Sequence, residues 1–385
     1  MSTTHPSLLS MLSELIAAPS VSSVSPAFDS SNRPVIDLLA TWLENEGFEV
    51  EVLPLAAQPG KANLIATLGR GPGGLVLAGH TDTVPYDEHQ WSNDPFSLTE
   101  KDGRLYGLGT SDMKGFFALA IEAARAFDRD QLRRPLIILA TADEESSMDG
   151  AKELVALGRP KARYAIIGEP TGLRPVNAHK GIIMEAIHLQ GHAGHSSDPS
   201  LGNNAIEGMH KAIAALLAWR TELQRQHTNP AFKVPVPTLN LGHIHGGDNP
   251  NRICGECELH IDLRPLPGMD LEELRSGLWQ TMEHALHDSG LGLSIRPLFS
   301  GTPAMQTPAD SPLVQAAERL TGHRAETVAF GTEGPYLTEM GMETLILGPG
   351  DIDQAHQPDE YLALDRLTPT VELLQQLIQR FCVDG

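Results

Sequence analysis

Three short apolar runs, each followed closely by a histidine or a carboxylate, constrain the fold of this chain most strongly. The runs cover residues 73–79, 136–141 and 164–168, and their length and composition predict buried β-strands. The polar residues that follow them are His80, the pair Glu144 and Glu145, and Glu169. In an open α/β sheet the carboxyl ends of neighbouring strands face one crevice, so we expect these side chains to converge there.

Strand and helix patterns alternate up to Glu169, with a helix expected at residues 113–127, and this alternation resumes from about residue 297. Such a pattern predicts a mostly parallel sheet flanked by helices. Between these two α/β stretches, the pattern of strands and helices changes. The expected order is a strand up to Gln190, a helix at 203–223, strands at 234–245 and 252–263, a helix at 271–287 and a strand near Ser294.

That order is typical of a ferredoxin-like α+β domain. The fold class expected is therefore α/β, with a split catalytic domain and an inserted ferredoxin-like domain. The expected limits are residues 1–180 for the first catalytic part, 181–296 for the insert and 297–385 for the second catalytic part.

The composition of the chain excludes some classes of function. The chain has 385 residues with 28 basic and 49 acidic side chains, a formal charge of −21, which argues against a nucleic-acid surface. It has no apolar run long enough for a membrane span and no secretory leader pattern, so we expect a soluble, cytoplasmic protein without a membrane partner. Three cysteines fit a reducing compartment.

The pair Cys254 and Cys257 has zinc-like spacing, but a structural zinc site needs a second ligand pair. The strand pattern around these cysteines also places them on opposite or skewed faces. We therefore expect no metal site there.

The residues after the strands are the types that hold two metal ions. Such ions polarise a carbonyl and lower the pKa of a water molecule, and the site needs a bridging carboxylate, a histidine and a carboxylate for each ion, and a free base. The inventory fits with Asp112 as the bridge and Glu144 as the general base. The terminal ligands are then His80 and Glu169 on one ion, and Glu145 and His356 on the other. Asp82 is placed to accept the second imidazole N–H of His80, although an N-cap or turn role is the ordinary alternative.

Four motifs resemble the signature blocks of the dinuclear metallo-aminoacylase and carboxypeptidase family. They are GHTDTVP (79–85), GLGTSDMKG (107–115), ADEE (142–145) and GEPT (168–171). Further blocks at 238–248, 251–254, 262–268 and 354–361 resemble the acetylornithine deacetylase group of that family. The resemblance extends over essentially the whole chain, and the metal-ligand roles given above agree with those of the family.

The resemblance implies further roles. The motif GHAGHSS (191–197) resembles the family's lid-domain motif, in which His195 would meet the substrate carbonyl oxygen. The insert would then be a lid and dimerisation domain, and the protein a homodimer. The implied cofactors are two divalent metal ions, zinc or cobalt. Arg252 is the preferred partner for a substrate carboxylate, with Asn251 as a further contact; Arg264 and Lys180 are alternative cations. The loop Gly331-Thr332-Glu333 is expected to contact the reacting end of the substrate, as the matching loop does in relatives.

Three functions remain in consideration. The first is removal of the acetyl group from N-α-acetyl-L-ornithine, a step in arginine biosynthesis. The second is the same chemistry on another small-molecule N-acyl amino acid, such as acetylcitrulline, acetylmethionine or succinyl-diaminopimelate, because specificity resides in lid and loop residues. The third is a catalytically silent binding protein, which the presence of every ligand and of Glu144 disfavours.

Overall fold

The computed structural model describes residues 5–384 and divides into two compact units. Unit 1 contains the chain up to Asn177, Gln306–Glu326 and Thr332 onward, and unit 2 contains Ala178–Met305 and Thr327–Gly331. The domain limits expected from the sequence, after residues 180 and 296, stay a prediction. The contacts of the chain divide it after Asn177 and after Met305.

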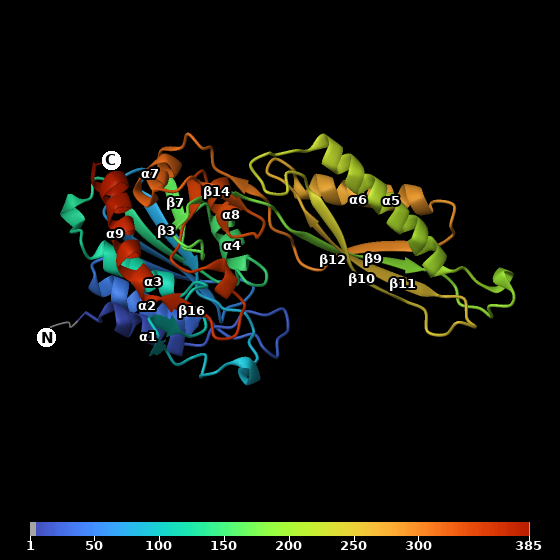
Figure 1. Ribbon diagram of the computed structural model, residues 1–385, viewed down its shortest axis with the longest axis horizontal. Coiled ribbons are helices and arrows are strands. Elements are labelled where there is room, and N and C mark those ends of the chain that lie inside the picture. The colour runs from blue at the N-terminus through green and yellow to red at the C-terminus, as the bar shows by residue number, and fades with distance from the viewer. Residues whose placement is uncertain (1–4, 385) are drawn as a thin grey trace. The chain divides into compact units, whose positions relative to one another are not determined.

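A nine-stranded sheet forms the centre of unit 1, in the order β1-β2-β6-β3-β7-β15-β8-β13 with β14 beside β8 (Figure 1). Its strands are β1 (Glu49–Pro54), β2 (Ala62–Leu68), β3 (Leu75–His80), β6 (Leu136–Thr141), β7 (Tyr164–Ile167), β8 (Val176–His179), β13 (Met305–Gln306), β14 (Glu326–Val328) and β15 (Glu343–Ile346). The central strands β6, β3, β7 and β15 are parallel, whereas β1 pairs antiparallel with β2, β2 with β6 and β8 with β15.

Every residue of β3, β6 and β7 is buried, so both faces of the sheet centre are covered. The helices of unit 1 are α1 (Leu8–Ala17), α2 (Arg33–Asn45), α3 (Gly115–Ala124), α4 (Asp149–Leu157), α7 (Pro312–Thr321), α8 (Gly334–Glu339) and α9 (Leu367–Ile378). Helix α3 contacts α1 and α9, and α4 contacts α8. The predicted α/β class with a mostly parallel sheet is confirmed. A small three-stranded sheet joins β4 (Thr99–Lys101), β5 (Arg104–Tyr106) and β16 (Tyr361–Ala363).

Unit 2 is an antiparallel sheet packed against two helices. Its elements, in chain order, are β9 (Ile183–Gln190), α5 (Ala205–Gln226), β10 (Thr238–Gly246), β11 (Glu256–Arg264), α6 (Leu271–Leu286) and β12 (Gly292–Pro297). The strand order β10-β11-β9-β12 gives the ferredoxin-like arrangement expected from the sequence. The inward side chains of β11 are buried and the alternate ones are partly exposed, so one face of the sheet packs on the helices and the other is polar.

Two strands of unit 2 are shorter than predicted. β10 starts at Thr238 rather than at residue 234, since Pro235 and Pro237 lack the N–H that a sheet ladder needs. β11 starts at Glu256 rather than at residue 252. Because Cys254 therefore precedes the strand, strand alternation does not apply to it, and Cys254 and Cys257 are both buried in the same core. The prediction of opposite or skewed faces was wrong.

Helix α5 is the longest helix, with 22 residues, and it carries charged side chains along its length. Across residues 5–384, no helix is long and apolar enough to cross a membrane.

Candidate metal centre

The candidate metal ligands lie where neighbouring strands of unit 1 end. His80 is the last residue of β3, Glu145 lies in the turn after β6, and Glu169 follows β7. Asp112 comes from the loop before α3, and His356 from the loop between β15 and β16. Because β6, β3 and β7 are adjacent parallel strands, their carboxyl ends meet, and the side chains far apart in sequence gather there.

Asp112 lies between the two histidines. Its Oδ1 is 3.2 Å from His80 Nε2, and its Oδ2 is 3.5 Å from His356 Nε2. A second carboxylate accompanies each imidazole: Glu169 Oε1 lies 3.6 Å from His80 Nε2, and Glu145 Oε2 lies 3.1 Å from His356 Nε2. Two histidine and carboxylate pairs that share a third carboxylate are the donor set of a dinuclear metal site.

Among residues 5–384, three groups of side chains offer ligand atoms within 4.8 Å of one another. They are His80, Asp112 and Glu169; Asp112, Glu145 and His356; and His80, Glu144 and Glu145. The first two groups share Asp112, as a bridging ligand requires. The donors are imidazole nitrogens and carboxylate oxygens, which suit zinc, cobalt and manganese.

The charge balance of the cluster also fits bound cations. Burial, together with the nearby carboxylates of Glu169 and Glu145, raises the pKa of Glu144 well above its usual value despite the opposing effect of His80. Burial and Asp112 likewise raise the pKa of Glu169. The hydrogen bond with Glu145 raises the pKa of His356 to about 9. Carboxylates crowded in this way repel one another, and divalent cations would stabilise their charged forms.

Asp82 does not make the contact expected from the sequence. The Nδ1 of His80 lies 3.0 Å from the backbone carbonyl oxygen of Asp82 but 3.7 Å from its carboxylate. The carboxylate instead accepts hydrogen bonds from the backbone N–H groups of Glu144 and Glu145, at 3.3 and 3.0 Å. The backbone carbonyl of Asp82 therefore orients the His80 imidazole. The side chain of Asp82 holds the turn that carries Glu144, the expected base.

A buried ion pair fixes the other side of that turn. Asp143 precedes Glu144, has a positive φ of 60° and is 1% exposed. Its carboxylate accepts hydrogen bonds from Lys61 and from the Ser22 hydroxyl, while Lys61 also pairs with Asp29 at 2.6 Å. Neither Lys61 nor Asp143 stood out as a functional residue in the sequence.

Glu360 lies in the block at residues 354–361 that resembles the family, and no role was predicted for it. Its buried carboxylate accepts hydrogen bonds from the backbone N–H groups of Gly109, Ser111 and Asp112, at 3.0, 2.7 and 2.9 Å. These bonds hold the loop that presents Asp112 and keep it outside the helix, so α3 begins at Gly115 rather than at residue 113. The signal available in the sequence was its position four residues after His356.

Glu333, in the loop expected to contact the reacting end of the substrate, is a second buried carboxyl group. It accepts a hydrogen bond of 2.6 Å from the Thr141 hydroxyl at the end of β6, and burial raises its pKa to about 7. Its neighbour Thr332, an expected substrate contact, is fully buried in unit 1, and its hydroxyl accepts a hydrogen bond from the Gly334 N–H. Gly331 is the last residue of unit 2.

The other expected substrate residues lie together in unit 2. Backbone pairing joins the loop of His195 to the loop of Arg252, and the Ser196 N–H donates to the Asn251 carbonyl at 3.1 Å. His195 is exposed, with its Nδ1 2.7 Å from the Ser197 hydroxyl. Arg252 pairs with Asp248.

The alternative cations in unit 2 are also engaged. Arg264 pairs with Asp262, and the Lys180 ammonium donates to the Val236 carbonyl at 2.7 Å.

The chain matches the family model for peptidase family M20/M25/M40 over residues 76–380. A relative from Edwardsiella ictaluri (strain 93-146), named acetylornithine deacetylase, is 53% identical over 382 residues, which are 99% of this chain and 100% of that protein. A metallo-carboxypeptidase of the M20 family from Sulfolobus solfataricus is similar in structure, with a TM-score of 0.76 and 18% identity over 98% of this chain and 99% of the other.

A Bacillus subtilis protein described as a dinuclear metal binding peptidase of the M20 family gives a TM-score of 0.67 at 17% identity, covering 97% and 98% of the two chains. The family resemblance predicted from the sequence motifs is confirmed. This chain belongs to peptidase family M20/M25/M40.

Proposed function

We propose that this protein is a metal-dependent amidohydrolase that converts N-α-acetyl-L-ornithine into ornithine and acetate, a step of arginine biosynthesis. We propose metal-dependent hydrolysis because Asp112 lies between His80 and His356, with Glu144 beside them. The choice of substrate is supported by the relative that bears the name acetylornithine deacetylase and matches along the full length of both chains.

Two zinc or cobalt ions are the proposed cofactors. His80 and Glu169 would hold one, Glu145 and His356 the other, and Asp112 both. When bound, such ions polarise the amide carbonyl and make hydroxide available near neutral pH.

The chain's own side chains supply proton transfer and orientation. Glu144 takes a proton from the attacking water and delivers it to the leaving amine. Asp82 and Asp143 keep Glu144 in place through the turn that they hold. His195 would donate a hydrogen bond to the oxyanion that develops on the carbonyl oxygen.

Arg252 and Asn251 are the proposed partners of the substrate's α-carboxylate, with Gly331 and Thr332 as further contacts. Binding a carboxylate would require Arg252 to exchange its partner Asp248 for the ligand. We also propose a homodimer formed through unit 2, since an isologous two-fold contact is the commonest assembly; sedimentation velocity tests it directly. A cytoplasmic location stays a prediction from the few cysteines.

The test of the proposed reaction is acetate release by the metal-loaded protein from a panel of N-acyl amino acids. We expect acetylornithine to be preferred over acetylcitrulline, acetylmethionine and succinyl-diaminopimelate, and turnover to disappear after chelation and return on adding zinc or cobalt. A preference for another substrate would keep the metal chemistry and refute the pathway. Turnover that persists in the chelated protein would refute the metal mechanism.

A further inference from the structure

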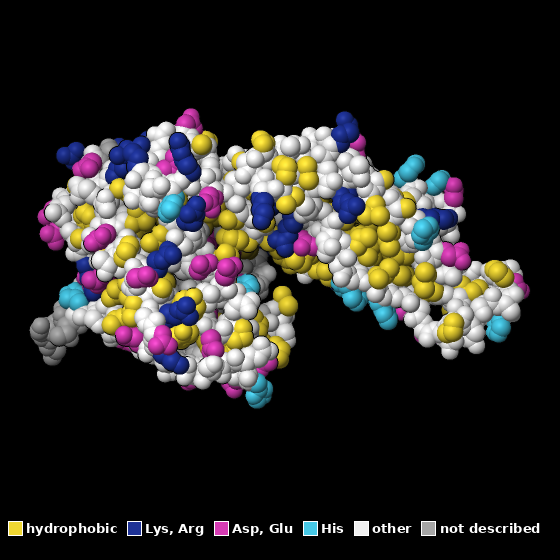
Figure 2. Space-filling view, viewed as in Figure 1, with side chains coloured by type: hydrophobic (Ala, Val, Ile, Leu, Met, Phe, Trp, Pro, Cys, Tyr) yellow, Lys and Arg dark blue, Asp and Glu magenta, His cyan; other side chains and the backbone are white. Residues whose placement is uncertain are grey.

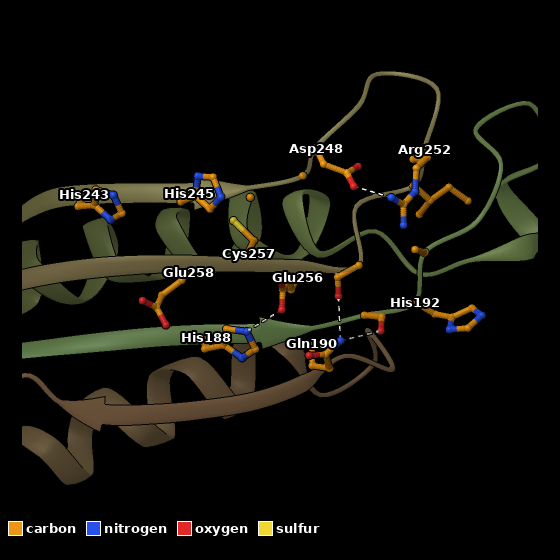
Figure 3. A pocket seen from close by; sticks show the side chains of 16 residues that line it. His188, Gln190, His192, His243, His245, Asp248, Arg252, Glu256, Cys257 and Glu258 are labelled. Carbon is orange, nitrogen blue, oxygen red and sulfur yellow. Dashed lines mark hydrogen bonds and ion pairs between the residues drawn. The ribbon is translucent and has the colours of Figure 1, made fainter.

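The polar face of the unit 2 sheet carries four histidines around one glutamate. They are His188 on β9, His243 and His245 on β10, and His260 beside Glu258 on β11; we refer to these five residues as the open-face cluster. His188, His243, His245 and Glu258, with Glu256 and Arg252 among the other lining residues, border a hollow of about 630 Å³, and His260 lies outside this lining (Figure 3). The space-filling view shows histidine side chains at the surface of unit 2 (Figure 2).

Strand register places the cluster members as direct neighbours. His243 is opposite His260, and His245 is opposite Glu258, in the β10 and β11 pair. Glu258 is in turn opposite His188 in the β11 and β9 pair. Opposite residues of an antiparallel pair have Cβ atoms about 4.5–5.5 Å apart, so two imidazoles in such positions can reach one ion.

The side-chain contacts bring three of these groups together. The rings of His243 and His260 have centroids 4.8 Å apart, and the Nε2 of His260 lies 2.7 Å from Glu258 Oε1. Two imidazoles and a carboxylate are therefore neighbours on a hydrogen-bonded sheet, which limits the movement of their backbones. Their ligand atoms do not all lie within 4.8 Å of one another, as those of the unit 1 groups do, so side-chain rotation would have to bring them onto one ion. His188 and Glu258 have side chains 29% and 28% exposed, so an ion from solvent can reach the cluster.

We propose that the open-face cluster binds a divalent transition-metal ion of the class that prefers imidazole, such as zinc, copper or nickel, through His243, His260 and Glu258. The site is distinct from the candidate metal centre, because every ligand proposed for that centre belongs to unit 1. His245 and His188 flank Glu258 on its two neighbouring strands and are available as a fourth ligand. Such an ion would tie the edge strand β10 to β11.

One cation already contacts the cluster. Arg296 on β12 lies 3.2 Å from Glu258 Oε1 and has a side chain 57% exposed. An exposed ion pair contributes little free energy, so the guanidinium can turn to solvent when a doubly charged ion takes its place. The carboxylate of Glu258 would also be stabilised more by a doubly charged metal ion than by the singly charged guanidinium.

Zinc stoichiometry of the full chain tests the proposal. Chelator-stripped protein is dialysed against Zn²⁺ at neutral pH, and the metal content is measured by elemental analysis. We expect one equivalent beyond those of the candidate metal centre, and its loss in the double variant His243→Ala/His260→Ala, with acetate release unchanged. Glu258→Gln should weaken the same equivalent at least about tenfold, since even outer partners of metal ligands change affinity by about 10–100-fold.

Two controls separate this site from other binding. Asp112→Ala should lose metal at the candidate centre and keep the equivalent that the double variant loses. His284→Ala/His287→Ala removes another pair of neighbouring histidines in unit 2, with ring centroids 6.1 Å apart, and should bind as much zinc as the natural protein. The proposal is overturned if the natural protein binds no additional equivalent, if the double variant keeps it, or if the control pair also loses it.

Discussion

Glu144 is the side chain assigned to proton transfer, and it is not required as a terminal metal ligand. We predict that Glu144→Ala lowers kcat about 10²–10⁴-fold, the usual contribution of a general base, while the bound metal stays near the natural level. Steady-state kinetics and elemental analysis of the same sample check both parts. Loss of metal with normal turnover per remaining ion would show that Glu144 is a ligand instead.

His179 gives a prediction for pH and stability. Burial lowers its pKa from 6.5 to about 4, so between these values the unfolded chain binds a proton that the folded chain does not. The folded state is therefore destabilised as pH falls below 6.5, by up to about 2 kcal/mol at pH 5. Urea unfolding at pH 7.5 and pH 5 should show a smaller decrease for His179→Gln than for the natural protein. The exposed His210→Gln should behave like the natural protein.

Some residues of the site could be identified from the sequence, and others could not. His80, Glu145 and Glu169 could be chosen because each follows an apolar strand, and the structure brings them together with Asp112 and His356. Glu360 could not be assigned a role, because the sequence does not distinguish a buried carboxylate with backbone N–H donors from an exposed one. The position of Asp82 was identified, but its carboxylate accepts hydrogen bonds from the turn of Glu144 and lies 3.7 Å from the His80 imidazole.

At the scale of elements, the loop that carries Asp112 depends on Glu360. Glu360→Ala would leave three buried N–H groups without their acceptor, and at about 1 kcal/mol or more for each the free energy of unfolding should fall by about 3 kcal/mol. We also predict weaker metal binding, because Asp112 would lose its fixed position. Isothermal titration with Zn²⁺ and urea unfolding measure the two effects.

Glu360→Gln keeps one oxygen acceptor and should lose less on both measures, and Glu372→Ala, at an exposed site on α9, should change neither. Unchanged metal affinity in Glu360→Ala would mean that Glu360 supports the fold without positioning Asp112. The sequence predicted most of these elements by type, whereas their ends depended on local chemistry: prolines shortened β10, and the bonds to Glu360 delayed the start of α3.

At the scale of the whole molecule, metal removal should lower stability as well as activity. Ions that bind only the folded chain stabilise it by about 2.7 kcal/mol at a hundredfold excess over Kd, and they relieve the repulsion among Asp112, Glu144 and Glu169. We predict a higher Tm with zinc than with chelator, measured by thermal unfolding. Asp112→Ala should show a much smaller difference, and an equal difference would place the stabilising ion elsewhere, with the open-face cluster as the first site to examine.

The fold class and family could be predicted from sequence because strand ends, motif spacing and the βαββαβ order are local patterns. The limits of the units could not be fixed in the same way. The chain passes between units within β8, β13 and β14, so these boundaries fall inside strands rather than in separate linkers.

Unit 2 interrupts unit 1 in the sequence, so the parts of unit 1 are synthesised at different times. β15 lies between β7 and β8 in the sheet, although the ribosome makes nearly all of unit 2 after β8 and before β15. Unit 2 is nearly continuous and can fold while the remainder is being translated. The sheet of unit 1 has to wait for β15, and His356 follows that strand by ten residues, counted from Ile346. A nascent chain therefore lacks His356, one of the proposed metal ligands, until unit 2 and β15 have both been made, so the full ligand set is present only after the strand that completes the sheet.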